Sequence, residues 1–171
     1  MERYEIEDTF CEIANELILN MKKELIEEAI KNLNEKEKEL VERKRSLFKA
    51  LKSVEEYGLS NVKFEYGGET YDARSILKVA HDAHEAGKLA IYPHLYVLIE
   101  PEKKYLYIGP VRVSGDYDIE TLEREVIKKI DSEINKIEDE LMELTLASVA
   151  NKEKVKELLI LQDALSRVCR I

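Results

Sequence analysis

Residues 4–57 read YEIEDTFCEIANELILNMKKELIEEAIKNLNEKEKELVERKRSLFKALKSVEEY, a run of 54 residues without a glycine or proline. Apolar residues recur in it at steps of three and four, which is the spacing of a helix with one buried face. Gly58 follows directly, and glycine is common just after the end of a helix. The run predicts one long helix, or two helices end to end, with an apolar seam of Ile6, Phe10, Ile13, Leu17, Ile26, Ile30, Leu33, Leu40, Leu47, Leu51 and Val54.

The sequence closes with a second run without glycine or proline, residues 118–171, which Asp118 is expected to cap. From Ile127 onward it keeps a heptad spacing, which is typical of a helix that packs along one seam. Two interpretations are open at Asn151, a polar residue within this seam. Either the helix is continuous and the polar residue fixes its alignment, or Asn151 caps a separate last helix that folds back. The seam consists of Ile127, Ile130, Ile134, Ile137, Leu141, Leu144, Ser148, Asn151, Val155, Leu158, Gln162, Leu165 and Cys169.

Length and charge predict that these two runs lie side by side and antiparallel. Each run has 54 residues, so two such helices would end level. Basic and acidic groups number 3 and 9 in residues 1–30, 8 and 6 in 31–57, 4 and 10 in 118–148, and 5 and 3 in 149–171. In the antiparallel arrangement each acidic block faces a basic one, which selects the orientation although single exposed ion pairs contribute little.

Between the two runs the composition changes sharply. All six glycines, all three prolines, all three histidines and eight of the nine tyrosines lie within residues 57–117. Because glycine and proline mark turns, this stretch predicts a small head inserted between two helical arms. We expect an α+β fold with long antiparallel, coiled-coil-like arms at 1–57 and 118–171 and a head at 58–117. The outline resembles that of prefoldin subunits, which also place β-hairpins between two coiled-coil helices, without a shared sequence motif.

The head is expected to have the order ββαββ. Alternating residues on both sides of Gly67-Gly68 predict a first hairpin over residues 62–72, because a two-residue primed turn requires positive φ. Asp72 can then cap a short helix that ends at Gly87. We expect Val62, Phe64, Tyr66 and Tyr71 on the inner face of this hairpin and Lys63, Glu65, Thr70 and Asp72 in water.

A second hairpin is expected from Leu95–Glu100 and Tyr105–Gly109, with a turn at Pro101–Lys104 and with Glu100 opposite Tyr105. One face then carries Leu95, Val97, Ile99, Leu106 and Ile108, and the other carries Tyr96, Leu98, Tyr105 and Tyr107. Both faces are apolar, so we expect this hairpin to be covered on two sides. These patterns do not determine the order of the strands in the sheet.

Composition limits the classes of function. The net charge of -9 argues against broad binding to nucleic acid or to an anionic membrane, because both need a positive field. No apolar run approaches the roughly 20 residues that span a bilayer, and no signal peptide pattern occurs, so we expect a cytoplasmic protein. Charged residues make up 37% and glutamine occurs once, a profile typical of proteins from hot environments. Cys11 and Cys169 are expected to be small core residues in a reducing compartment.

The arms are too apolar for a two-stranded pair at the end away from the head. A helix that is apolar on most sides must be buried on most sides. A second copy of the chain would bury these residues in the four-helix base of a homodimer, and a last helix that folds back would bury the same set. The apolar residues outside the seam are Cys11, Ile18, Leu19, Met142, Leu146, Val149, Leu159, Ile160 and Leu161.

One candidate site is the tyrosine-bearing side of the second hairpin. Stacking aromatic rings edged by cations are typical of sheets that hold single-stranded nucleic acid. The competing interpretation is a protein interface or an ordinary core. The residues concerned are Tyr96, Tyr105 and Tyr107 with Lys103, Lys104 and Arg112 nearby. A further basic cluster, residues 43–45, is interpreted as a solvated helix face.

A second candidate site is a metal centre at the histidines of the head. His81 and His84 share one side of the short helix with Glu85, and His94 could complete a zinc-type set. Histidines on a surface or at a helix end explain the same spacing. The sequence contains no phosphate-binding loop, nucleophile elbow or metalloprotease motif, and we expect no cofactor.

Together these observations favour a non-enzymatic interaction protein. In this hypothesis a homodimer with a coiled-coil stalk displays a head whose tyrosine-rich hairpin contacts a partner protein. The first alternative is an accessory protein that binds single-stranded nucleic acid through the same face. The second alternative is a metal-dependent enzyme or sensor that uses the head histidines.

Overall fold

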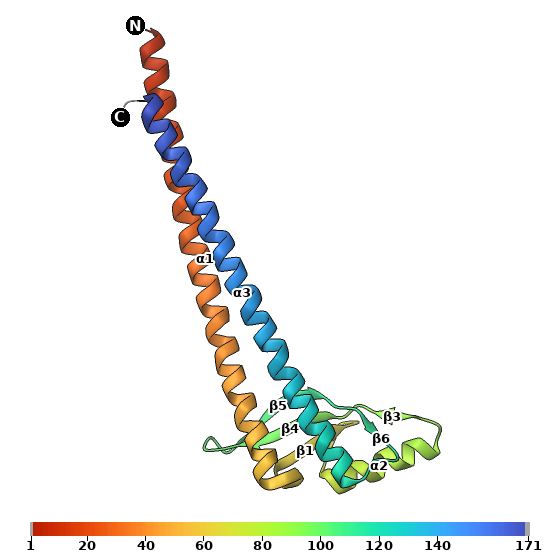
Figure 1. The fold of residues 1–171 in the computed structure, drawn as a ribbon. Helices are drawn as coiled ribbons and strands as arrows, with labels where there is room; N and C mark the ends of the chain where they lie inside the picture. The colour runs from red at the N-terminus through yellow and green to blue at the C-terminus, as the bar shows by residue number, and fades with distance from the viewer. Residues whose placement is uncertain (1, 170–171) are drawn as a thin grey trace. The chain divides into compact units, whose positions relative to one another are not determined.

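The computed structural model describes residues 2–169, and for residues 2–8, 22–23, 25–26, 30, 166 and 169 it describes the backbone alone. The chain has an α+β fold with two long helices and a small antiparallel sheet (Figure 1). The helices are α1 (Glu2–Tyr57), α2 (Ala73–Glu85) and α3 (Ile119–Cys169), and a short 3-10 helix, η1 (Gly58–Asn61), follows α1. The strands are β1 (Val62–Tyr66), β2 (Glu69–Tyr71), β3 (Ala90–Ile91), β4 (His94–Ile99), β5 (Lys104–Pro110) and β6 (Val113–Ser114).

The chain divides into two compact units, to which α1 and α3 both contribute. The helical unit consists of residues 1–39 and 140–171, and the sheet unit consists of residues 40–139. The sheet unit therefore takes in the end of α1 and the beginning of α3 as well as the residues that we expected to form the head.

Both long runs form single helices. α1 ends at Tyr57, and Gly58 follows with a φ of 63°, the left-handed conformation that glycine adopts without strain. α3 continues through Ser148 and Asn151, so the interpretation of Asn151 as the cap of a separate helix is wrong. Asn151 is half-buried in line with the apolar seam, where a polar residue is tolerated at some cost in stability.

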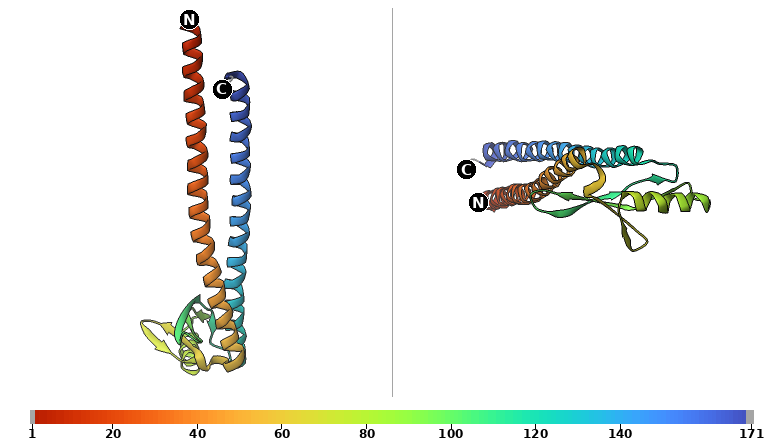
Figure 2. Two further views of the ribbon diagram at one scale, coloured as in Figure 1. Left: turned by 90° about the vertical axis from the view of Figure 1, so that its left-hand side faces the viewer. Right: turned by 90° about the horizontal axis from the view of Figure 1, so that it is seen from below.

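In the helical unit the two helices run side by side (Figures 1 and 2). The predicted α3 seam is confirmed: each of its positions from Leu141 to Leu165 is half-buried, and every residue between them is exposed. The predicted α1 seam positions Ile6, Ile26 and Ile30 lie outside the described side chains. No helix in the described part of the chain is apolar over a stretch long enough to cross a membrane.

Near the start of α1 the predicted seam is wrong. Cys11 and Ile18 are buried, whereas the predicted seam residues there are more than half exposed: Phe10, Ile13 and Leu17. Cys11 forms a disulfide bond, so the expectation of a reduced cysteine is wrong as well. Disulfide geometry holds the two Cα atoms about 4.4–6.8 Å apart, so Cys11 must face its bonding partner. Phe10, Ile13 and Leu17 are then turned outward. The other cysteine in the sequence is Cys169, whose side chain is outside the described part.

The sheet unit is built around one hydrophobic core. Its two helical segments continue the predicted seams, and β1 and β4 contribute alternate residues. The Nζ atom of Lys44 on α1 lies 3.2 Å from Oε1 of Glu138 on α3, an ion pair of the kind that the charge blocks predicted. Each large apolar side chain that is fully buried contributes roughly 1.5–3 kcal/mol. The core includes Leu47, Ala50, Val54, Val62, Phe64, Ile76, Leu95, Val97, Ile99, Leu122, Val126, Ile130 and Ile134.

The four-stranded sheet has the order β2-β1-β4-β5, and all its neighbouring strands are antiparallel. The first hairpin is confirmed: Gly67 and Gly68 have φ values of 60° and 82°, which form the primed turn between β1 and β2. The carboxylate of Asp72 caps α2 as predicted, because its Oδ1 accepts a hydrogen bond from the Ser75 amide at 2.8 Å. β5 is left as one edge of the sheet.

The second hairpin forms in a register two residues away from the predicted one. Ile99 lies opposite Lys104 and Leu98 opposite Tyr105, so the predicted pairing of Glu100 with Tyr105 is wrong. Lys103 adopts a φ of 50°, and this left-handed residue lets the chain reverse within residues 100–103. A shift of two residues leaves each side chain on its predicted face, because side chains alternate along a strand with a period of two.

The sequence did not predict the ribbon of β3 and β6, which pairs Ala90 with Ser114 and Ile91 with Val113. Strands of two residues are too short to show a periodic pattern. The ribbon lies against α2 at Gly115, where an added Cβ atom would be 2.3 Å from Cβ of His84. The position therefore requires glycine for the close approach.

Candidate interaction surface on the sheet

Strand alternation gathers the tyrosines of the second hairpin on one face of the sheet. Lys63 lies opposite Tyr96, Tyr96 opposite Tyr107, and Leu98 opposite Tyr105. Residues that are directly opposite in antiparallel strands project from the same face. We call this surface the tyrosine face, and it consists of Lys63, Glu65, His94, Tyr96, Leu98, Tyr105 and Tyr107.

The tyrosine face is open in the described part of the chain. Tyr105 and Tyr107 are each 40% exposed, and Tyr96 and Leu98 are half-buried. On the opposite face, Val97 is completely buried. The expectation that both faces of the second hairpin are covered is therefore wrong. Tyrosine hydroxyls and the charged neighbours from β1 can stay hydrated, so this face tolerates water in a way that the aliphatic face does not.

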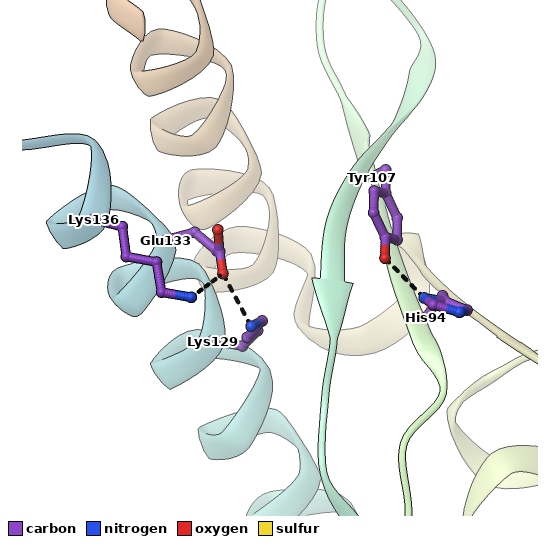
Figure 3. A network of polar contacts seen from close by, with 5 residues as sticks. All are labelled: His94, Tyr107, Lys129, Glu133 and Lys136. Atoms are coloured by element: carbon purple, nitrogen blue, oxygen red, sulfur yellow. Dashed lines mark hydrogen bonds and ion pairs between the residues drawn. The ribbon is translucent and has the colours of Figure 1, made fainter. Parts of the chain in front are cut away.

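Contacts among the side chains fix the arrangement of the tyrosine face. The Tyr107 hydroxyl lies 2.8 Å from Nδ1 of His94, as Figure 3 shows. The ring centroids of Tyr96 and Tyr107 are 5.1 Å apart with the rings tilted by 46°, within the range in which aromatic pairs attract each other. Nζ of Lys63 lies 4.0 Å from the centroid of the Tyr105 ring, a cation–π contact. Because these side chains are already ordered, they lose less rotamer freedom when a ligand binds.

Tyr96 remains a hydrogen-bond donor at neutral pH. Desolvation raises the pKa of its phenol, and a hydrogen bond to the Glu65 carboxylate raises that pKa further. The phenol is therefore neutral, and its hydroxyl donates to Glu65. This contact ties the third tyrosine of the face to β1.

The structure brings together three of the six residues predicted for this site, Tyr96, Tyr105 and Tyr107. Lys104 lies opposite Ile99, so it projects from the other face, and Lys103 is in the turn. Arg112 belongs to a separate group, in which its Nη1 lies 3.4 Å from the Tyr117 hydroxyl. The sequence prediction missed Lys63 and His94. Lys63 joins the tyrosines only through the pairing of β1 with β4, whereas His94 begins β4 itself, one residue before the predicted strand and on the same face as Tyr96.

At the edge strand β5, one carboxylate of α3 meets two lysines. Oε1 of Glu133 lies 3.0 Å from Nζ of Lys129 and 3.1 Å from Nζ of Lys136 (Figure 3). Lys129 lies across Gly109 of β5, where an added Cβ atom would be 3.1 Å from Cε of Lys129. The side chains of Lys129 and Glu133 are only 19% and 21% exposed. They are therefore held in place and are not freely solvated surface groups.

Arg43 of α1 is half-buried. Desolvation lowers the pKa of its guanidinium, whereas electrostatic interactions with Glu133 and Tyr107 raise it. The interpretation of residues 43–45 as a solvated face is therefore wrong for Arg43.

The three histidines predicted as metal ligands have different neighbours. Nε2 of His81 lies 3.4 Å from Oε1 of Glu85 on the same helix. His84 packs on Gly115, and His94 contacts Tyr107. Among the described residues, no group of three or more His, Cys, Asp and Glu side chains is placed to hold a metal ion.

Most of the residues predicted to form an oligomer interface are exposed in the helical unit. Ile18 is the exception, because it is 4% exposed and lies in the seam. The side chains of Leu19, Met142, Leu146, Leu159 and Ile160 are between 50% and 67% exposed. Other exposed apolar side chains of the same unit are Phe10, Ile13, Leu17, Met21, Val149, Leu161 and Val168.

Comparison with known proteins gives no relative. No family model, no curated protein and no solved structure matches the chain.

Proposed function

We propose that the protein is a non-enzymatic interaction protein and that the tyrosine face binds a partner protein. The observation that carries this proposal is the open cluster of Tyr96, Tyr105 and Tyr107, which is held by His94 and Lys63. Tyrosines are enriched in the energetically dominant centres of protein interfaces, because they bury a large area and lose few degrees of freedom. A preordered aromatic surface fits this role.

The proposal includes a homodimer formed by the helical unit, with α1 and α3 packing as a coiled coil. On the outer side of α3, Met142, Leu146 and Val149 follow one another at steps of four and three, which makes a continuous apolar stripe. Phe10, Ile13 and Leu17 make a similar stripe on α1. A symmetric dimer needs a single self-complementary patch, so a second copy of the chain can cover both stripes.

We further propose a cytoplasmic location. Disulfide bonds are rare in reducing compartments, with intracellular proteins of heat-loving organisms as the known exception. The highly charged composition and the disulfide of Cys11 fit that exception together.

The binding role of the tyrosine face is tested by photo-crosslinking in extracts of the source cells. A photoreactive phenylalanine analogue replaces Tyr105, and in a matched control it replaces Tyr92, which is 59% exposed and outside the tyrosine face. We expect one protein to be crosslinked from position 105 and displaced by excess wild-type protein, but not by the Tyr96→Ala/Tyr107→Ala variant. Equal crosslinking from position 92, or equal displacement by the variant, would contradict the proposal.

The second candidate function is binding of single-stranded nucleic acid. The neighbouring rings of Tyr96 and Tyr107 favour it, because bases stack on aromatic side chains with about 1–3 kcal/mol each. It requires salt-dependent binding of an oligonucleotide that is lost in the Tyr105→Ala/Tyr107→Ala variant. Unchanged oligonucleotide affinity in that variant would eliminate this candidate and leave the protein-binding role untouched.

A further inference from the structure

β5 is an edge strand of the sheet and carries two residues of the tyrosine face. Tyr105 and Tyr107 are each 40% exposed, and in the described part of the chain β5 pairs with β4 alone. With seven residues β5 is the longest strand of this sheet, whereas β2 at the opposite edge has three. An edge strand leaves alternate backbone N–H and C=O groups without a partner in the sheet. β5 is therefore the longer of the two edges to which a further strand could be added.

The register shows which backbone groups of β5 point away from the sheet. The amide of Val111 donates to the carbonyl oxygen of Pro93 at 3.0 Å, so the Pro93 carbonyl points toward the segment that contains β5. Backbone groups alternate in direction along a strand, and Val97, four residues further on, therefore points the same way. Leu106 lies opposite Val97 and directs its own N–H and C=O groups toward β4.

Tyr105 and Tyr107 flank Leu106, so their N–H and C=O groups point to the open edge. The first hairpin gives the same result. Its two-residue turn requires Tyr66 and Glu69 to be a hydrogen-bonded pair, and alternation across β1 and β4 again leaves Tyr105 facing outward. No backbone hydrogen bond from a segment outside the sheet reaches either tyrosine in the described part of the chain. Two donors and two acceptors therefore lie at the edge beside the two rings.

An extended peptide matches these backbone groups. Groups two residues apart on a strand are about 7 Å apart, and another strand presents complementary groups at the same spacing. A helix uses its backbone groups internally, and a nucleic acid has no such row of amides. A peptide added to β5 also places alternate side chains on the tyrosine face, where they pack against Tyr105 and Tyr107.

We propose that the partner protein docks on β5 as an added strand, through an extended segment that pairs with the backbone of Tyr105 and Tyr107. This proposal rests on the proposed function and adds the conformation and the chemistry of the partner segment. Two side chains of the segment lie on the tyrosine face and are apolar or aromatic. The side chain between them lies on the other face beside Leu106, which is half-buried, and is apolar as well.

The charges at the start of β5 favour an acidic residue at the neighbouring end of the segment. Lys104 is exposed, and Lys103 is in the turn before it. The carboxylate of Glu102 in the same turn is already paired with Lys49. Opposite charges on adjacent strands stabilise the pairing, so a carboxylate of the segment is expected beside Lys104.

The same charges disfavour a second copy of the chain as the added strand. Pairing two β5 strands antiparallel about Leu106 would place Lys104 of one copy opposite Ile108 of the other. Lys129 lies across Gly109, the next residue along β5, and would then be close to that lysine. Like charges in such positions are destabilising.

Hydrogen exchange of the whole chain, followed by NMR, tests the direction of the backbone groups. We expect the amides of Tyr105 and Tyr107 to exchange at least about 10-fold faster than the amide of Leu106, because an amide that is bonded within the sheet exchanges only when the sheet opens. Equal protection of the three amides would overturn the proposal, since Tyr105 and Tyr107 would then already have partners.

Competition for the crosslink formed from position 105 in extracts of the source cells tests the docking. Tyr107→Ala removes the ring, and Tyr107→Pro removes both the ring and the outward N–H, which an edge strand tolerates. Halving the crosslink should take about 10-fold more Tyr107→Pro than Tyr107→Ala, because a carbonyl group of the partner loses its donor. Thr70, exposed in the middle of β2, provides the matched control, and Thr70→Pro should compete as well as Thr70→Ala.

Urea denaturation shows whether the competitors fold. If Tyr107→Pro does not fold, Tyr105→Pro is compared with Tyr105→Ala in the same competition, with the same expected ratio. Failure of both proline variants to fold would overturn the proposal, since the sheet does not need an N–H that points away from it.

The docking mode and the binding role fail in different ways. If the proline and alanine variants at position 107 compete equally while wild-type protein displaces the crosslink, the added strand is wrong and the proposed function stands. An equal loss of competition in Thr70→Pro also overturns the added strand at β5, as does a crosslinked species that is a second copy of the chain. If no protein is crosslinked from position 105, both proposals fail.

Discussion

The Nζ atom of Lys63 on β1 lies 4.0 Å from the centre of the Tyr105 ring on β5, although β4 lies between these two strands. The lysine side chain therefore reaches across the tyrosine face. It joins two residues that are 42 positions apart in the sequence. This contact holds the Tyr105 ring in place and engages the ammonium group of Lys63.

Replacing Lys63 by methionine keeps the length of the side chain and removes its charge. We expect the free energy of unfolding in urea to fall by about 0.5–1 kcal/mol, the contribution of an exposed cation–π contact. Lys78→Met, at an exposed position on α2, is the control and should change it by less. Equal losses in the two variants would show that the contact with Tyr105 does not stabilise the sheet.

The local elements of the fold were predictable because each depends on residues that are neighbours in the sequence. Gly67-Gly68 between alternating residues specifies the first hairpin, and Asp72 specifies the start of α2. The long helices follow from the absence of glycine and proline and from the seam, which the structure confirms from Leu141 to Leu165.

The interaction surface was predictable only in part, because it depends on contacts between distant segments. The period of two places Tyr105 and Tyr107 on one face whatever the register. His94 reaches this face by the same alternation along β4. The arrival of Lys63 depends on the pairing of β1 with β4, which no local pattern encodes. The first turns of α1 carry two apolar rows, one with Cys11 and Ile18 and one with Phe10, Ile13 and Leu17. The disulfide of Cys11 selects the first row for burial, and the sequence pattern does not reveal this bond.

The pKa of Glu133 predicts how stability depends on pH. Desolvation raises this pKa, but the hydrogen bonds and charges of Lys129 and Lys136 lower it by more, so it lies below the ordinary glutamate value of 4.5. A carboxyl group of this kind stabilises the fold above its unfolded-state pKa, and the contribution is lost as the pH falls through the folded-state pKa.

We therefore expect wild-type protein to be more stable than Glu133→Gln at pH 7, and the difference in unfolding free energy to shrink once the pH falls below 4.5. Urea denaturation between pH 7 and pH 3 measures this difference. Lys136→Met removes one of the two cations that lower the pKa of Glu133. In a protein that carries Lys136→Met, the effect of Glu133→Gln on the unfolding free energy should therefore depend less on pH. If the difference in unfolding free energy between wild type and Glu133→Gln stays constant from pH 7 to pH 3, the pKa of Glu133 is not lowered in the folded protein.

The disulfide of Cys11 predicts that the stability depends on redox conditions. Removing a native disulfide typically costs about 2–4 kcal/mol, largely because the unfolded chain gains freedom. We expect Cys11→Ser to lose stability by this amount in chemical denaturation without a reductant. Dithiothreitol should lower the stability of the wild-type protein to the same level and leave the stability of Cys11→Ser unchanged. If dithiothreitol does not change the stability of the wild-type protein, Cys11 does not form a disulfide bond.

The exposed stripe on α3 predicts the oligomeric state. Light scattering coupled to size-exclusion chromatography should give twice the chain mass of 19.9 kDa for the wild-type protein. Leu146→Glu combined with Ile160→Glu should reduce it to the mass of one chain, because a charge cannot be buried in the apolar interface without a partner. Ala147→Glu, exposed on the same helix, should remain a dimer. A wild-type protein of 19.9 kDa would contradict the homodimer.

The most direct test of the binding role is the affinity of the partner, once identified by crosslinking, for variants of the tyrosine face. By isothermal titration calorimetry the Tyr105→Ala/Tyr107→Ala variant should bind it at least about 100-fold more weakly than wild type, since central aromatic residues of an interface contribute about 2 kcal/mol or more each. Tyr92→Ala should bind as wild type does. If the double variant binds with wild-type affinity, the tyrosine face is not the site of interaction.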